Sequence, residues 1–100
     1  PAFDVGIQVL RDANTYTKRI TVTFQGGKGQ YLTQRVDVRV TREDGTVEEK
    51  SITRPETGSI IAGSSVAFTG SYLDRVEVTV TINGVPYKVY DKLLPLESRS

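Results

Sequence analysis

The stretch RVEVTVTINGV, residues 75–85, decides the fold of this chain. Apolar residues occupy every second position and alternate with charged or hydroxyl-bearing ones; they are Val76, Val78, Val80 and Ile82. This period of two is typical of a β-strand with one buried face and one wet face. The Asn-Gly pair that follows accepts the positive φ that both central residues of a type I′ turn require. The stretch therefore predicts a strand that returns in a two-residue hairpin.

The turn also predicts the register of that hairpin. Counting outward from it, the predicted pairs are Ile82 with Val85, Thr81 with Pro86, Val80 with Tyr87, and Val78 with Val89. The returning strand should then face the core with Val85, Tyr87 and Val89 and face away with Pro86, Lys88 and Tyr90. The missing N–H of Pro86 would point away from the partner strand, where it blocks further pairing. We therefore expect the last strand to be a sheet edge, at least at its start.

The same alternation recurs elsewhere in the chain. It is clear over residues 20–25 and 35–41 and weaker over 5–9 and 66–68, and turn residues separate these runs at 25–30, 43–46, 55–58 and 62–65. Residues 46–54 are mostly charged, as expected of an exposed edge strand that avoids foreign strands. No stretch has helical periodicity, and at most one turn of helix is expected, around Leu73. About seven short strands predict one all-β domain over residues 1–100, an immunoglobulin-like two-sheet antiparallel sandwich with a frayed tail at 96–100.

Composition excludes several classes of protein. The chain has 100 residues, 13 basic and 12 acidic, and contains no His, Cys, Met or Trp. A net charge of +1 favours neither nucleic acid nor anionic lipid as a partner. No apolar run approaches the roughly 20 residues that span a bilayer. Because the chain begins Pro1-Ala2-Phe3 without Met, we expect it to be part of a longer protein.

The candidate chemical sites are weak. The glycine-rich stretch 25–30 has neither a dinucleotide-binding nor a phosphate-loop pattern. Residues 43–46 predict a second hairpin turn, which leads into the charged strand 46–54. The acidic residues near this turn could supply oxygens to Ca²⁺, although their spacing matches no calcium loop; they are Glu43, Asp44, Glu48 and Glu49. Without His or Cys, the commonest general base and the thiolate nucleophile are both missing. We predict that the protein is not an enzyme and that it has no catalytic, cofactor or metal residues.

Four segments carry a resemblance to a known family. They are 20–27 (ITVTFQGG), 62–70 (AGSSVAFTG), 74–81 (DRVEVTVT) and 87–94 (YKVYDKLL). In this order they resemble the C-terminal extracellular β domain of archaeal type IV pilin-like surface proteins. The family pattern lacks an insertion as long and charged as residues 46–58. The resemblance implies an extracellular domain at the cell surface, with a membrane or filament helix preceding Pro1.

Two functions follow as expectations. One is a structural or assembly role in such a surface protein, and the other is an immunoglobulin-like adhesion module that binds a glycan or protein through its loops or a sheet edge. The partners would be proteins or other copies of the chain, with no nucleic acid and no direct insertion into a membrane. The expected interaction edge lies beyond Pro86 on the last strand and consists of Lys88, Tyr90, Lys92 and Leu94. The alternative is that Tyr90 and Leu94 are ordinary surface residues at a fraying end.

Overall fold

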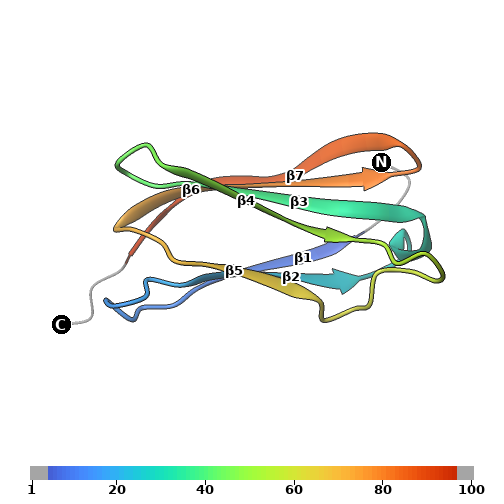
Figure 1. Ribbon diagram of the computed structural model, residues 1–100, viewed down its shortest axis with the longest axis horizontal. Helices are drawn as coiled ribbons and strands as arrows, with labels where there is room; N and C mark the ends of the chain where they lie inside the picture. Colours follow the sequence, from blue (N-terminus) through green and yellow to red (C-terminus); the bar gives the residue numbers. More distant parts are fainter. Residues whose placement is uncertain (1–4, 97–100) are drawn as a thin grey trace.

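The computed structural model describes residues 5–96, which form two antiparallel sheets packed face to face (Figure 1). One sheet has the order β1-β2-β5 and the other has the order β4-β3-β6-β7. The strands are β1 (Gly6–Arg11), β2 (Ile20–Gly26), β3 (Thr33–Thr41), β4 (Val47–Thr53), β5 (Ser65–Phe68), β6 (Leu73–Ile82) and β7 (Val85–Pro95). The predicted all-β sandwich with seven strands is confirmed.

The topology is immunoglobulin-like, with one strand in a different place. In a constant-type immunoglobulin domain the first, second, fourth and fifth strands share a sheet. Here β4 pairs with β3 instead, so the sheets have three and four strands. The hairpin at residues 42–46 explains this, because Arg42 N–H donates to the Thr46 carbonyl (2.8 Å) and Gly45 closes the turn with a φ of 89°.

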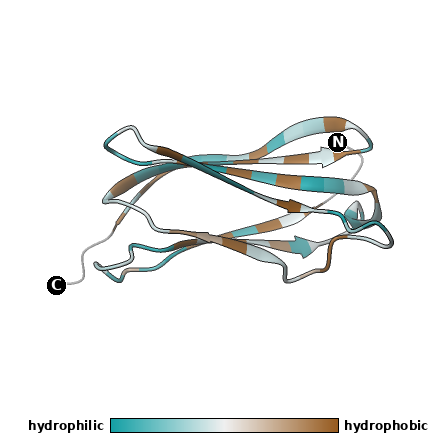
Figure 2. Cartoon of the chain, viewed as in Figure 1, coloured by the Kyte–Doolittle hydropathy of each residue, from teal (hydrophilic) through white to brown (hydrophobic). Residues whose placement is uncertain are grey.

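The core is built from the three alternating runs that the sequence shows. Each run turns its β-branched or aromatic residues inward, and bands of opposite hydropathy alternate along the strands in Figure 2. The fully buried members include Ile20, Val22, Phe24, Val36, Val38, Val40, Val76, Val78 and Val80. Burying these faces between two sheets about 10 Å apart is the main stabilising contribution.

The Asn83–Gly84 turn has the predicted form, with φ values of 51° and 81°. Ile82 pairs with Val85, Thr81 with Pro86 and Val80 with Tyr87, as predicted. The register then shifts by one residue at a bulge, because Thr79 pairs with Lys88 but Val78 pairs with Tyr90. The predicted Val78–Val89 pair is therefore wrong.

The bulge reverses the faces of the second half of β7. Val89 is the extra residue and is 44% exposed, whereas Tyr90 packs against the core. Val85, also expected to face the core, is 47% exposed because it lies at the end of the sandwich. Tyr87 faces the core as predicted.

Regular helix plays little part in the described residues. A single 3-10 turn, η1, covers Gln30–Leu32 at the end of the glycine-rich stretch, and Leu73 lies in β6. Leu96 is also ordered, since its N–H donates to the Tyr72 carbonyl (2.7 Å), so the expected fraying does not begin at this residue. The remainder of the expected tail, residues 97–100, lies outside the described part of the chain. Among residues 5–96, no helix is long and apolar enough to cross a membrane.

Candidate functional site

The expected interaction edge of β7 does not form one surface. Lys88 lies on the outer face of the four-stranded sheet, opposite Thr79, whereas Tyr90, Lys92 and Leu94 pair with residues of the inner face. Tyr90 and Leu94 are half-buried against the core, and partial burial raises the pKa of the Tyr90 phenol. The Lys92 ammonium lies 5.4 Å from the centre of the Tyr90 ring. The expectation that Tyr90 points outward is therefore wrong, because the bulge at Val89 turns it inward.

The free backbone of β7 is protected at both ends. The Asn83–Gly84 turn at the start of β7 and the Leu96–Tyr72 hydrogen bond just beyond its end determine the pattern of backbone bonding. They determine which residues direct their N–H and C=O groups toward β6 and which direct them away from the sheet. The outward positions at the two ends of the strand are Pro86 and Pro95, neither of which has an N–H to offer. With the bulge between them, β7 offers a partner strand only the short stretch around Asp91 and Leu93. β7 is an edge strand as predicted, but it is more strongly protected than the sequence suggested.

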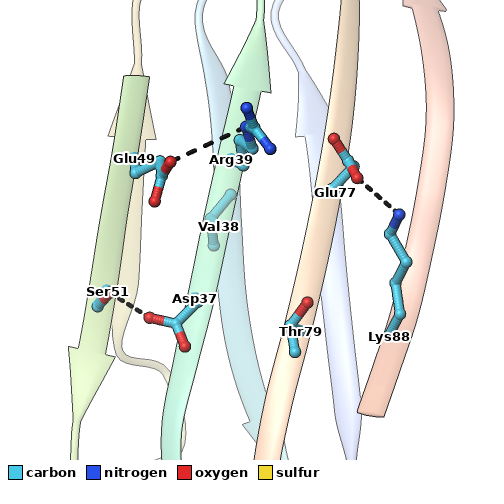
Figure 3. A pocket seen from close by; sticks show the side chains of 8 residues that line it. All are labelled: Asp37, Val38, Arg39, Glu49, Ser51, Glu77, Thr79 and Lys88. Atoms are coloured by element: carbon cyan, nitrogen blue, oxygen red, sulfur yellow. Dashed lines mark hydrogen bonds and ion pairs between the residues drawn. The ribbon is translucent and has the colours of Figure 1, made fainter. Parts of the chain in front are cut away.

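The outer face of the four-stranded sheet contains a shallow polar hollow of about 360 Å³ (Figure 3). Its lining is Asp37, Val38, Arg39, Glu49, Ser51, Glu77, Thr79 and Lys88. Figure 3 shows Glu77 paired with Lys88 (2.6 Å), Arg39 with Glu49 (3.9 Å), and Ser51 donating to Asp37 (2.5 Å). Every charged group in the hollow thus has a partner of opposite sign, since Asp37 also accepts from Arg35 (2.8 Å). The hollow is a network of surface ion pairs and holds no unpaired charge for a ligand.

Asp91 of β7 extends this ion-pair network, since its carboxylate lies 2.9 Å from Lys88 and 2.8 Å from Arg75. The network makes stability depend on pH. Hydrogen bonds from Arg75 and then Lys88 lower the pKa of Asp91. Partial burial would raise the pKa of Asp37, but hydrogen bonds from Arg35 and Ser51 outweigh it and lower that pKa as well. A carboxylate with a depressed folded-state pKa contributes stability above its unfolded pKa of about 3.9, and the contribution is lost as the pH falls through the folded value.

We therefore expect Asp91→Asn to lower the urea midpoint of unfolding at pH 7 and to lower it by a smaller amount near pH 2, where the unfolded carboxyl is protonated but the folded one is not fully so. Arg75→Gln should behave in the same way, because it removes the bond that depresses the Asp91 pKa most. Urea titrations at pH 7, 4 and 2 measure the difference. An equal difference between Asp91→Asn and the parent protein at all three pH values would contradict this prediction.

Three loops meet at one end of the sandwich, at the right in Figure 1. The η1 turn is joined to the loop of residues 54–64 by two hydrogen bonds, from Gln30 Nε2 to the Ile60 carbonyl (3.0 Å) and from Arg54 to the Tyr31 carbonyl (3.4 Å). The hairpin turn at 83–84 is joined to the same region, since Asn83 N–H donates to the Leu32 carbonyl (3.1 Å) and Gly84 N–H to Gln34 Oε1 (2.5 Å). The loops are therefore held in fixed relative positions.

A glycine makes this arrangement possible. Gly26 has a φ of 83°, and a Cβ at this position would lie 2.7 Å from Gln30 Oε1. Only glycine adopts this conformation without strain and leaves room for the Gln30 side chain that reaches the next loop. The glycine-rich stretch thus positions the η1 turn.

The joined loops expose large side chains, which we call the loop-end surface: Tyr31, Leu32, Arg54 and Ile61. Tyr31 is 75% exposed and Ile61 is 74% exposed. Aromatic residues and Arg are enriched at protein interfaces, and a surface that is already ordered loses little entropy on binding. The sequence showed these residues only as parts of separate loops.

A buried ion pair was also missed from the sequence. Asp74 of β6 is completely buried and accepts hydrogen bonds from Arg11 of β1 and from the backbone (2.8 Å) and hydroxyl (2.6 Å) of Ser71. Arg11 also donates to the Ser71 carbonyl, and this network joins the two sheets. Gly70 lies against it, since a Cβ there would be 2.6 Å from Asp74 Oδ2 and 3.1 Å from the Arg11 guanidinium.

Three of the four acidic residues considered for Ca²⁺ are engaged with their own neighbours. Asp44 Oδ1 accepts from the Thr46 backbone (2.9 Å) and hydroxyl (2.7 Å), and these bonds lower the Asp44 pKa. Glu48 pairs with Arg42 (2.5 Å) and Glu49 with Arg39. Within residues 5–96, the structure contains no group of three or more His, Cys, Asp or Glu side chains that could hold a metal ion.

Comparison with known proteins provides no family. No protein-family model matches the sequence, and no curated protein is significantly similar to it. One similar solved structure is described as the "Putative ApaA Protein from Bordetella pertussis", with 14% sequence identity over 94% of each chain and a TM-score of 0.45. At this identity and TM-score, the likeness supports no inference about this chain.

Proposed function

We propose that this domain is a non-catalytic recognition module that binds a protein partner through the loop-end surface. The observation that carries the proposal is the set of hydrogen bonds that joins the three loops beneath Tyr31 and Ile61. Ordered loops with exposed aromatic and aliphatic side chains favour binding, because few side chains and no loop must be ordered when the partner arrives. Loops at one end of a sandwich are also where immunoglobulin variable domains bind their ligands.

The chemistry of this surface favours a protein over a glycan. Its apolar members, Leu32 and Ile61, offer no hydrogen bonds to sugar hydroxyls, whereas Tyr31 and Arg54 are typical anchors of protein interfaces. Tyr16, 92% exposed in the turn between β1 and β2, lies at the opposite end of the sandwich and provides a matched control.

Crosslinking in cells that express the full-length protein tests the proposal. A photo-reactive amino acid at position 31 should yield an adduct with one discrete protein, and the same group at position 16 should not. With that partner purified, Tyr31→Ala should weaken binding at least about tenfold, as hot-spot truncations do, and Tyr16→Ala should leave it unchanged. Equal adducts at both positions, or unchanged affinity of Tyr31→Ala, would contradict the loop-end assignment.

A second candidate function is a structural role in an archaeal pilin-like surface protein. The sequence resemblance over residues 20–94 supports it, and under this proposal the domain is extracellular and assembles with other proteins or copies. Leu93 is the feature that favours an edge contact. Its side chain is 63% exposed on the outer face of β7, and its backbone N–H and C=O groups point away from β6. Tyr90 and Leu94 are unsuitable for testing it, because charges at these half-buried positions would destabilise the fold.

Leu93→Asp separates this role from the loop-end role. If the β7 edge serves in assembly, the full-length variant should fail to assemble at the cell surface while its isolated domain unfolds at the same urea concentration as the parent. Normal assembly of Leu93→Asp would exclude this edge. Lys88→Ala, which also changes the charge of an exposed outer-face residue on the same strand by removing its ion pair with Glu77, controls for a general effect of surface charge.

A further inference from the structure

The described residues contain four edge strands, and β4 is the one whose backbone edge is unprotected along its whole length. β7 carries a proline at each end and a bulge, and the register of β1 shifts between Gly6 and Ile7. β5 has four residues; the Ala67 carbonyl at its free edge accepts a bond from Lys50, and the Thr69 carbonyl just beyond its end accepts one from Arg42. β4 differs, since its seven residues pair with β3 without a shift and include no proline or glycine.

The backbone of β4 presents a regular row of free groups. Hydrogen bonds at its two ends, from Arg42 N–H to the Thr46 carbonyl (2.8 Å) and from Arg54 N–H to the Gln34 carbonyl (2.9 Å), determine which residues face β3. Alternation then turns the N–H and C=O groups of four residues away from the sheet: Val47, Glu49, Ser51 and Thr53. An unpaired row of this kind is a template for another strand.

Inward-pointing charges on an edge strand ordinarily deter such pairing. In β4 these charged side chains already have partners within the same molecule. Lys50 Nζ donates to the Ala67 carbonyl (2.5 Å) and lies 5.2 Å from the centre of the Phe68 ring. Glu48 binds Arg42, and its other oxygen lies 3.8 Å from Lys50. These side chains lean over the open margin between the two sheets, where Lys50 and Glu48 stay 42% and 38% exposed and Arg42 donates to the Thr69 carbonyl (2.8 Å). The backbone edge of β4 is therefore left clear.

We propose that β4 pairs antiparallel with β4 of a second copy about a two-fold axis at Glu49. A two-fold interface joins a surface to itself, so the pattern along the strand must be complementary to its own reverse. With the axis at Glu49, Glu48 faces Lys50 of the second copy, and the reciprocal pair forms as well. With the axis at Lys50, Glu48 would face Ile52 and Glu49 would face Ser51, so the two ammonium groups would meet with no opposite-charge pair across the contact to offset them.

The cost of this register is moderate. The two Glu49 side chains meet at the axis on the outer face, but each already has an Arg39 guanidinium on the adjacent strand (3.9 Å). The product is one continuous eight-stranded sheet. A contact between two seven-residue edges is smaller than a standard interface, so the dimer should form reversibly at high concentration. This inference does not depend on the loop-end function.

Sedimentation of the domain at concentrations from about 0.01 to 1 mM tests the dimer, and proline substitution locates it. Glu49→Pro removes an outward N–H and no bond to β3, so the fold should persist and the dimer should be lost. Leu93→Pro, at the corresponding outward position of β7, should dimerise like the parent. A monomer at 1 mM, or loss of the dimer only in Leu93→Pro, would overturn the proposal.

Because the chain contains no cysteine, single-cysteine variants test the register. Residues paired at a hydrogen-bonded site lie about 5.5 Å apart between Cα atoms, which a disulfide can span. Glu49→Cys should therefore form a covalent dimer under mild oxidation. It should do so at least about tenfold faster than Thr53→Cys, because in this register the two copies of residue 53 lie eight positions apart along the paired strands. Equal rates for the two variants would overturn the pairing, and faster crosslinking of Lys50→Cys than of Glu49→Cys would overturn the axis.

Discussion

Asp74→Ala is expected to lower the free energy of unfolding by about 3–5 kcal/mol. Asp74 is completely buried, and its partner Arg11 has a side chain that is 13% exposed. Removing the carboxylate leaves the guanidinium buried without its counter-charge and removes the acceptor for two bonds from Ser71. Urea titration at pH 7 measures the loss.

The control for this prediction is Glu49→Ala, which removes an exposed carboxylate and should change the free energy of unfolding by less than about 0.5 kcal/mol. The double variant Arg11→Met/Asp74→Leu should recover part of the loss, because it removes both buried charges. Recovery should be incomplete, since the polar groups of Ser71 lose their partners. If Asp74→Ala were no more destabilising than Glu49→Ala, the ion pair would not stabilise the contact between the sheets.

Phe24→Ala should lower the free energy of unfolding by about 3–5 kcal/mol. Phe24 is the largest fully buried side chain and lies on β2, the central strand of the three-stranded sheet. Its truncation removes the transfer free energy of the ring and leaves a cavity that the sheets cannot close, because hydrogen bonds hold the strands on both sides of β2.

Phe24→Leu tests how much of this free-energy cost comes from the lost volume of the side chain. It keeps most of the apolar volume and should cost about 1.5 kcal/mol or less. Chemical denaturation of both variants tests this, and a change in midpoint with a constant slope indicates altered stability of the same fold. Equal costs for Phe24→Ala and Phe24→Leu would mean that the core collapses around the smaller residue.

The two expected edges show how far local patterns reach. β4 could be identified as an edge because charges cover both faces of residues 46–54, and no buried strand carries such a pattern. β7 was identified from the position of Pro86 in a register that the Asn83–Gly84 turn sets. The bulge could not be seen, because Val85, Tyr87 and Val89 alternate as regularly as a continuous strand does. Tyr87 and Tyr90 are three residues apart and would face opposite sides of a regular strand. They indicate the bulge only when both are known to be half-buried against the core.

The candidate sites depend on residues that are distant in the sequence. Asp74 resembles a turn residue before a strand, and it is buried because Arg11 reaches it across the sandwich from 63 residues away. The loop-end surface needs Gln30 to reach Ile60 and Asn83 to reach Leu32. No pattern within either loop records these contacts.

The sequence by itself determined the all-β class, the three strands that form the core, the type of the Asn83–Gly84 turn and the identity of the two outer strands of the larger sheet. Each of these properties depends on the alternation of side chains along a strand or on the φ preference of one or two residues, which neighbours in the sequence set. Only the tertiary structure decided the bulge at Val89, the burial of Asp74 and the meeting of three loops. These features depend on packing between segments far apart in the chain, where a side chain finds its partner only after the two sheets have closed on each other.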